Sequence, residues 1–322
     1  MAKILDKNTI EKIINKATHK ELVTCVEKAF TEYSCNNAVV PPAGSLSFDD
    51  PPGDMHIKYG YIKHDTNYVV KIASGFYKNP TIGLSSSYGL NLVFNQKTGF
   101  LETILLDEGI LTNTRTALAG VIAAKYLAPK DVKLIGIIGS GIQARLQLKY
   151  LKGIVNCRKV IVWGIDKNEL QSYKEEMSKE GFDIEIASDS KRIAQACNLI
   201  VTTTPSNSAI IFAKDLQKGT HITAVGADTK GKQELDTAII KNANHIVVDS
   251  FKQCCEFGEI HKAVNAGLLD KHKIIELGDV ILSGGIQRKD DDITVADLTG
   301  IATQDVQISN FILDQLNNQS KN

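Results

Sequence analysis

The chain has 322 residues, of which 43% are hydrophobic and 23% are charged, proportions typical of a folded globular protein that is too long for one ordinary core. Lys and Arg number 37, as do Asp and Glu, so no net field attracts nucleic acid or an anionic membrane. No uncharged apolar stretch approaches the roughly 18 residues of a transmembrane helix, and no signal peptide is visible, so we expect a cytoplasmic protein.

The first third of the chain predicts a helix followed by a group of strands. Apolar residues recur at helical spacing between residues 21 and 33 and predict an amphipathic helix. Beyond a proline-containing loop, apolar runs separated by turn signals predict several strands. These strands are expected over residues 55–62, 68–73, 86–94 and 99–106. Because no helix separates them, we expect an antiparallel or mixed sheet.

From Thr114 the pattern changes, and strands and helices alternate. An Ala-rich helix is expected over residues 116–127, with Arg115 opening it. Strands are then expected over 132–138, 159–163, 184–186, 199–203, 221–225 and 245–248, and helices over 142–151, 167–179 and 190–196. This alternation predicts a doubly wound parallel sheet. A last amphipathic helix is expected over residues 301–316. We therefore predict an α/β chain in which an N-terminal sheet domain precedes a Rossmann domain.

The segment 133–144 carries the most specific signal, because an apolar run leads into G-x-G-x-x-A and a helix follows. Gly139 permits the tight turn, Gly141 lets the backbone approach a pyrophosphate, and Ala144 lets helix and strand pack closely. The flanking strand and helix are the context that this motif needs. We therefore predict a dinucleotide site, with a glycine-rich turn that binds nothing as the alternative. The predicted turn comprises Gly139, Ser140, Gly141, Ile142, Gln143 and Ala144.

An acid beyond the second strand of this unit indicates which dinucleotide binds. Such an acid holds the adenosine ribose hydroxyls in many dinucleotide-binding folds, and Asp166 is the only one in range. No Arg is present to receive a 2′-phosphate, and Lys167 is the only nearby cation. The sequence therefore favours NAD, with NADP as the alternative. Asp166 is also suited to cap the helix that follows it.

Three charged residues outside the glycine turn are candidates for substrate chemistry. Arg115 lies at the domain junction, where it could clamp a substrate carboxylate or form an ordinary salt bridge. Lys71 lies within an apolar strand and points either to solvent or into a cleft. Asp228 follows a strand, where ligands of α/β sheets bind, and either meets the ligand or caps a turn.

Cysteine and histidine usage gives no sign of a metal centre. The six cysteines form no C-x-x-C motif, which indicates reduced thiols in a cytosolic protein. The seven histidines show no metal-ligand spacing. We expect no bound metal.

Five segments together resemble the ornithine cyclodeaminase/μ-crystallin family, and the similarity runs from about Val40 to Gln307. The matching patterns are L-T-x-x-R-T at 111–116, A-A-K-x-L-A at 123–128, G-x-G-x-Q-A at 139–144, T-T-T-P-S at 202–206, and G-T-H-I-x-A-x-G-A-D-x-x-G-K-x-E-L at 219–235. The resemblance implies a substrate and dimerisation domain over residues 1–114, completed by a C-terminal helix within 301–322. It also implies a Rossmann NAD(P)-binding domain over residues 115–300 and a homodimer.

The resemblance also implies roles for individual residues. Arg115 and Lys71 match the ligands of the substrate carboxylate, and Asp228 matches the acid beside the reacting amine. We assign Lys71 and Asp228 to catalysis, and we assign the substrate to Arg115, Lys71, His56, Lys58 and Ser86. Outside the glycine turn and Asp166, the assigned cofactor contacts are Thr116, Thr203, Thr204, Pro205, Val225, Gly226 and Ala227. The resemblance implies that Thr203 to Pro205 lie near the nicotinamide ribose and that Val225 to Ala227 pass near the nicotinamide.

The chain departs from its relatives at the side-chain end of the substrate site. Ala43 stands where several members carry a basic residue, and His56 stands where the cyclodeaminase has Glu and the alanine dehydrogenase has Arg. The amino acid itself is therefore left open. The expected activity is NAD(P)-dependent oxidation and reduction of an L-amino acid and imino acid pair. Redox-neutral cyclodeamination of a diamino acid such as ornithine is the alternative, and a non-catalytic, μ-crystallin-like binding protein is a third reading.

Overall fold

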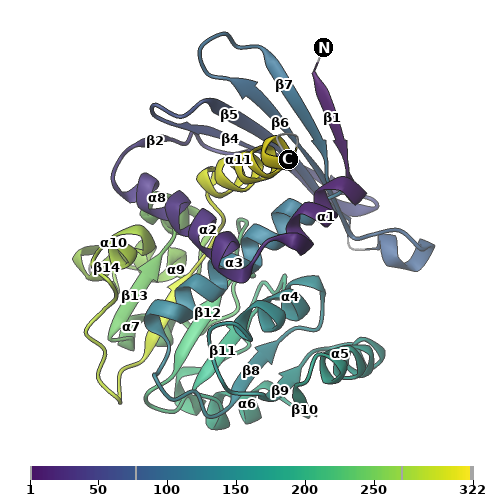
Figure 1. Cartoon of the computed structure of the whole chain (residues 1–322). Helices are drawn as coiled ribbons and strands as arrows, with labels where there is room; N and C mark the ends of the chain where they lie inside the picture. Colours follow the sequence, from purple (N-terminus) through teal and green to yellow (C-terminus); the bar gives the residue numbers. More distant parts are fainter. Residues whose placement is uncertain (1, 77, 270, 320–322) are drawn as a thin grey trace. The chain divides into compact units, whose positions relative to one another are not determined.

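The structure is a computed structural model that describes residues 2–76, 78–269 and 271–319. The chain divides into two compact units, of which the first combines Met1–Arg115 with Ile301–Asn322 and the second is Thr116–Gly300 (Figure 1). Each unit is built on its own sheet. No helix in the described parts of the chain is both long enough and apolar enough to cross a membrane.

The first unit contains a seven-stranded mixed sheet in the order β1-β7-β6-β5-β4-β2, with β3 paired to β4. Its strands are β1 (Lys3–Asp6), β2 (Ala38–Val39), β3 (Gly44–Asp49), β4 (Pro52–Ile62), β5 (Asn67–Phe76), β6 (Ser87–Asn95) and β7 (Leu101–Leu106). Strand β1 runs parallel to β7, and the other pairs are antiparallel. The four predicted strands are thus confirmed as β4 to β7, whereas β1, β2 and β3 escaped prediction.

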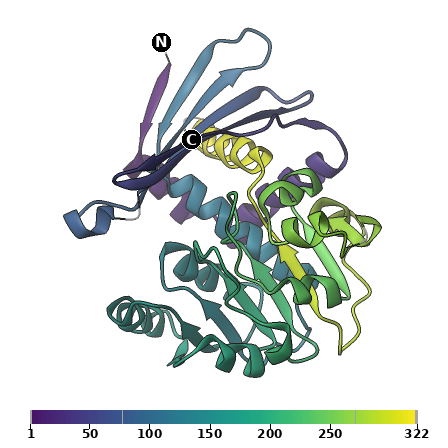
Figure 2. The same ribbon diagram turned by 180° about the vertical axis from the view of Figure 1, so that it is seen from behind.

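Helices of this unit pack on one face of the sheet (Figures 1 and 2). They are α1 (Lys7–Lys16), α2 (His19–Ser34), the first turns of α3 (Ile110–Leu127) and α11 (Ala302–Gln319). A 3-10 turn, η1 (Asn79–Ile82), lies between β5 and β6 in the chain. Helix α2 begins at a capping box in which Thr18 and Glu21 bond each other's backbone N–H groups. Helix α11 packs on α2, β4 and β5, so the C-terminal segment completes the core of the first unit.

Strand periodicity gives the sheet two different faces. Lys71 and Asn91 are buried on the face toward α11. Their register brings them into one cross-strand row with Lys58, since Lys58 pairs with Lys71 and Lys71 pairs with Asn91. Alternate residues point to the other face. That face exposes large apolar side chains, namely Ile4, Tyr59, Tyr61, Tyr88 and Leu106.

The second unit contains an eight-stranded, fully parallel sheet in the order β10-β9-β8-β11-β12-β15-β13-β14. Its strands are β8 (Ile135–Ile138), β9 (Lys159–Trp163), β10 (Asp183–Ile186), β11 (Leu199–Thr202), β12 (His221–Ala224), β13 (His245–Val248), β14 (Ile274–Glu276) and β15 (Thr294–Asp297). Its helices are α4 (Ile142–Leu151), α5 (Lys167–Lys179), α6 (Ser190–Ala196), α7 (Thr237–Asn242), α8 (Phe251–Phe257), α9 (His261–Asn265) and α10 (Leu277–Leu282), with 3-10 turns η2 (Ala213–Asp215) and η3 (Lys271–Lys273). This topology confirms the predicted doubly wound sheet.

One boundary differs from its prediction in a way that bears on the site. Helix α3 begins at Ile110, so Arg115 lies in its second turn and does not open the helix. The Asp107 carboxylate accepts a hydrogen bond from the backbone N–H of Leu111 at 2.8 Å. This contact satisfies one of the free N–H groups of the first turn and supports the earlier start.

Candidate functional site

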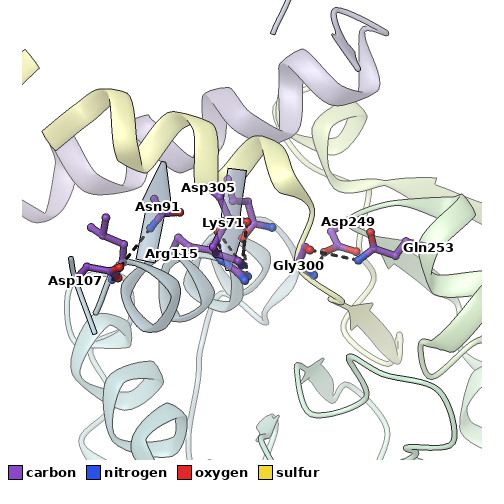
Figure 3. A network of polar contacts seen from close by, with 10 residues as sticks. Lys71, Asn91, Asp107, Arg115, Asp249, Gln253, Gly300 and Asp305 are labelled. Carbon is purple, nitrogen blue, oxygen red and sulfur yellow. Dashed lines mark hydrogen bonds and ion pairs between the residues drawn. The ribbon is translucent and has the colours of Figure 1, made fainter. Parts of the chain in front are cut away.

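Two cations of the first unit converge on one carboxylate (Figure 3). Lys71 Nζ lies 2.9 Å from Asp305 Oδ2, and Arg115 Nε lies 3.1 Å from Asp305 Oδ1. The side chains of Lys71, Arg115 and Asp305 are 2%, 7% and 3% exposed. They come from β5, α3 and α11, so the cluster forms only when the C-terminal helix packs on the sheet. Asp305 was not among the predicted site residues.

Burial and charge set the protonation of this cluster. Burial lowers the pKa of Lys71 to about 7, and the positive charges of Arg115 and Lys58 act in the same direction, while Asp305 opposes them. Burial alone would raise the pKa of Asp305, but its contacts with Lys71 and Arg115 outweigh burial and lower it. The cluster therefore holds an ionised carboxylate beside a lysine poised to gain or lose its proton near neutral pH.

A second acid lies close to this cluster. Burial raises the pKa of Asp107 to about 6, although its bond from Leu111 acts in the opposite direction. Asn91 Nδ2 reaches Asp107 Oδ1 at 3.5 Å, the long limit of a hydrogen bond (Figure 3). Asp107 thus joins the start of α3, which carries Arg115, to the sheet that carries Lys71.

The remaining predicted substrate residues lie at different distances along the sheet. Lys58 pairs directly with Lys71 across β4 and β5. His56 lies one pleat further along the same face of β4, where its Nε2 is 3.5 Å from Asp54 Oδ1. Ser86 precedes β6, and its carbonyl accepts from the N–H of Phe76 at the far end of β5. The structure therefore brings Lys58 to the cluster and His56 near it, but leaves Ser86 outside it.

The glycine turn in the second unit has the geometry of an anion site. Gly139 adopts φ +106°, which L side chains rarely adopt, and a Cβ there would lie 2.5 Å from Thr203 Oγ1. Gly141 is the N-cap of α4 and supplies no side-chain cap, whereas α5 and α6 are capped by Asp166 and Asp189. The N-terminus of α4, which has no side-chain cap, therefore suits an anionic ligand such as a pyrophosphate.

Asp166 performs the capping role that the sequence offered as its alternative. Its Oδ1 accepts from the N–H groups of Asn168 and Glu169 at 2.8 and 3.0 Å. Asp166 and Lys167 are both exposed at the end of β9. A contact between the Asp166 carboxylate and a ribose stays a prediction.

The predicted nicotinamide segments lie at the ends of two neighbouring strands. Thr203, Thr204 and Pro205 follow β11, and residues 225–227 follow β12, which pairs with β11. Glu234 hydrogen-bonds to both segments, and sequence reasoning missed it. Burial raises the pKa of Glu234 to about 7, opposed by the hydrogen bonds that its carboxylate accepts.

Asp228 and Thr116 belong to the second unit. The Asp228 side chain is 48% exposed, and its Oδ1 lies 2.7 Å from Lys232 Nζ. The carbonyl of Thr116 accepts a hydrogen bond from Gln147 Nε2 at 3.1 Å. These contacts leave the predicted roles of both residues untested.

A further network in the second unit fixes the chain before it enters α11 (Figure 3). Asp249 accepts from the N–H groups of Thr299 and Gly300 at 3.0 and 2.6 Å. Gln253 Nε2 donates to Thr299 Oγ1 at 3.0 Å and to the carbonyl of Gly300 at 3.3 Å. These bonds hold Thr299 and Gly300 in place, and these two residues lie just before the start of α11, the helix that carries Asp305.

Comparisons with known proteins find one family over nearly the whole chain. The model of the ornithine cyclodeaminase/mu-crystallin family matches residues 5–320. An uncharacterized cyclodeaminase of Sinorhizobium fredii is 36% identical over 322 residues, covering 99% of this chain and 97% of the relative. An archaeal alanine dehydrogenase dimer with bound NAD is 30% identical with a TM-score of 0.89, covering 99% and 97% of the two chains. The Delta(1)-pyrroline-2-carboxylate reductase of Thermococcus litoralis, in complex with NADH and L-proline, is 27% identical with a TM-score of 0.90, covering 98% of each chain.

Proposed function

Since the chain belongs to the ornithine cyclodeaminase/mu-crystallin family, we propose that it is an NAD(P)-dependent oxidoreductase acting on the C–N bond of an L-amino acid and imino acid pair. The observation that carries this proposal is the buried pair of cations, Lys71 and Arg115, which already converges on a carboxylate. Two hydrogen-bonded cations at one buried point suit the carboxylate that every such substrate carries.

Asp305 keeps this carboxylate site charged and oriented. The Asp305 carboxylate accepts hydrogen bonds from Lys71 Nζ and Arg115 Nε, and Arg115 Nη1 donates to Gln304 Oε1 at 3.3 Å. The guanidinium is thus held through two of its nitrogens, Nε and Nη1. Substrate bound to the two cations has its Cα fixed, which replaces a random encounter with a positioned one.

NAD fits the second unit, because the uncapped N-terminus of α4 and the close packing of Gly139 on Thr203 form the cradle that a pyrophosphate needs. When bound, NAD+ would supply a hydride acceptor for Cα of the amino acid, and NADH would supply the hydride donor for the imine. Gly139, Gly141 and Ala144 hold the pyrophosphate end, and the exposed Asp166 disfavours a 2′-phosphate.

Asp228 acts at the amine. Its exposed carboxylate, which lies 2.7 Å from Lys232 Nζ, stabilises the positive charge that develops on the substrate nitrogen. The same oxygens accept a proton from the amine or from an attacking water. Attack of water on the imino acid releases ammonia and a 2-oxo acid. Reduction of a preformed imine to the amine is the same hydride transfer in the opposite direction.

The working form is a cytoplasmic homodimer. The similar archaeal alanine dehydrogenase is a dimer, and the sheet of the first unit exposes an apolar face suited to a subunit interface. The six cysteines are all free thiols, as suits a reducing compartment.

A panel of 2-oxo acids with ammonia, cyclic imines, L-amino acids and diamino acids tests the activity, followed by NADH absorbance and by ammonia release. We expect at least one amino acid or imine in the panel to be converted with formation or consumption of a stoichiometric amount of NADH. NADH binding without turnover of any member of the panel would contradict the proposal.

A second candidate is redox-neutral cyclodeamination of a diamino acid, which the similarity to the Sinorhizobium fredii cyclodeaminase favours. Asp228 suits this reaction too, because ring closure requires a proton acceptor at the nitrogen. Ammonia release from a diamino acid without net NADH identifies it.

A further inference from the structure

The segments after β11 and β12 are joined by the carboxylate of Glu234, which is completely buried. Oε1 accepts from the backbone N–H and the hydroxyl of Thr204 at 2.6 and 2.7 Å. Oε2 accepts from the Thr202 hydroxyl at 2.7 Å and from the N–H of Gly226 at 3.0 Å. Each oxygen thus accepts two hydrogen bonds, and a carboxylate offers about four acceptor positions.

The segment that carries Glu234 is itself fixed. The backbone N–H groups of Glu234 and Leu235 donate to the carboxylate of Glu259 at 2.7 and 2.9 Å. The backbone carbonyl of Glu234 accepts from the N–H groups of Ile210 and Ile211 at 2.7 and 3.1 Å. Glu234 is therefore a rigid support rather than a side chain that adapts to the strand ends.

The strand ends also approach each other closely around this carboxylate. A Cβ on Gly226 would collide with the Glu234 carboxylate and with the backbone carbonyl of Thr204. A Cβ on Gly139 would collide with the hydroxyl of Thr203. The glycine turn and the two strand ends therefore fit together only while the Thr204 and Gly226 amides stay in place.

We propose that Glu234 is a positioning residue that fixes the two segments receiving the nicotinamide half of the cofactor. This inference rests on the proposed function, in which Thr203–Pro205 lie near the nicotinamide ribose and Val225–Ala227 lie near the nicotinamide ring. Glu234 makes no contact with the cofactor itself. Its effect on affinity passes through the amides of Thr204 and Gly226.

Glu234→Gln tests the proposal with little change in shape. The two backbone donors lie on different oxygens, so either orientation of the carboxamide turns its NH2 group toward one of these N–H groups. A hydroxyl can rotate away from such a clash, but a backbone amide cannot. One strand end must therefore lose its acceptor and shift.

The experiment compares NADH with ADP, which lacks both the nicotinamide and its ribose, by titration calorimetry on the full chain. We expect Glu234→Gln to raise the Kd for NADH about tenfold, the weight of one buried hydrogen bond, and to change the Kd for ADP by less than about twofold. Thr202→Val removes one bond to Oε2 and leaves both amides paired, so we expect a smaller weakening with the same selectivity. Thr220→Val is the matched control for Thr202→Val. It also deletes a buried threonine hydroxyl, but this hydroxyl is bonded to the Gln217 carbonyl before β12 begins, away from Glu234.

Equal weakening of both ligands by Glu234→Gln would overturn the inference, as would an unchanged NADH affinity. If Glu234→Gln fails to fold, Thr202→Val decides the matter by the same two affinities. A wild-type chain that binds neither ligand would overturn the proposed function, and the inference with it, whereas wild-type binding with unchanged selectivity in the variants overturns the inference alone.

Discussion

At the residue scale, Lys71 has the protonation behaviour expected of a substrate ligand that also senses pH. Its ammonium group is buried beside two other cations and one anion, and its pKa is lowered to about 7. The charged form therefore predominates below about pH 7 and is lost as the pH rises through that value. A substrate carboxylate binds the charged form.

We therefore predict that kcat/KM for the best amino acid falls above about pH 7, by up to about tenfold per pH unit. Lys71→Arg keeps a positive charge throughout this range, so its profile should lose the limb even if its absolute rate is lower. The measurement is a pH profile of both proteins with the same substrate. An identical limb in Lys71→Arg would assign the titration to another group.

Asp228 separates binding from chemistry. Asp228→Asn preserves shape but removes the negative charge opposite the substrate nitrogen, a charge that matters most once the cation forms. We predict that kcat falls by roughly 10²–10³ while KM changes little. Steady-state kinetics measures both constants, and an unchanged Kd for NADH checks that the cofactor site is intact. Near-normal kcat would show that Asp228 serves only as the partner of Lys232.

The sequence located some members of the cluster and missed others for a clear physical reason. Lys71 and Arg115 are visible because each is a charge inside an apolar pattern. Asp305 lies on an amphipathic helix where a carboxylate looks like an ordinary solvated residue. Its partners are 234 and 190 residues away in the chain, and no local pattern reports a contact of that range.

At the element scale, strand ends and helix caps set the cofactor site. The strands and helices from β8 to α6 were predictable because their periodicity is clear and Asp or Gly marks most helix starts. Helices α7 to α10 were not predicted; they are five to seven residues long, which leaves little room for a helical repeat, and α6, with seven residues, is the one helix of that length that was predicted. Strand β3 is exposed along its whole length, so no buried face imposed an alternating pattern on it.

Asp166 allows the cap of α5 to be separated from cofactor choice. Asn caps a helix about as well as Asp, whereas Ala costs about 1 kcal/mol. We predict that Asp166→Asn keeps the thermal stability but narrows the preference for NADH over NADPH, and that Asp166→Ala loses both. Melting temperatures and the two dissociation constants decide this. A full NADH preference in Asp166→Asn would limit Asp166 to capping.

At the scale of the whole molecule, the two-faced sheet of the first unit predicts how subunits associate. Leu92 lies on β6 at the centre of the face away from α11, between Val70 and Ile104 of the neighbouring strands. Tyr68 and Phe94 stack nearby with centroids 4.8 Å apart. Burying such a face against a second copy removes much apolar surface from water.

We predict that Leu92→Glu converts the proposed dimer into a monomer, because a carboxylate at that point would be buried without a partner. Leu282→Glu is the control, since Leu282 is exposed on α10 of the other unit. Sedimentation velocity at micromolar concentration distinguishes the two states. A dimeric Leu92→Glu protein would place the interface elsewhere.

The discontinuous first unit has a consequence for the order of events during synthesis. Residues 116–300 are contiguous and carry their own sheet, so all of that unit is synthesised before α11. The sheet of the first unit, made first, lacks the helix that packs on β4 and β5 until α11 emerges. The ion pairs of Asp305 can therefore form only after α11 has been synthesised, and a polypeptide that stops short of residue 302 lacks the carboxylate that holds its two buried cations together.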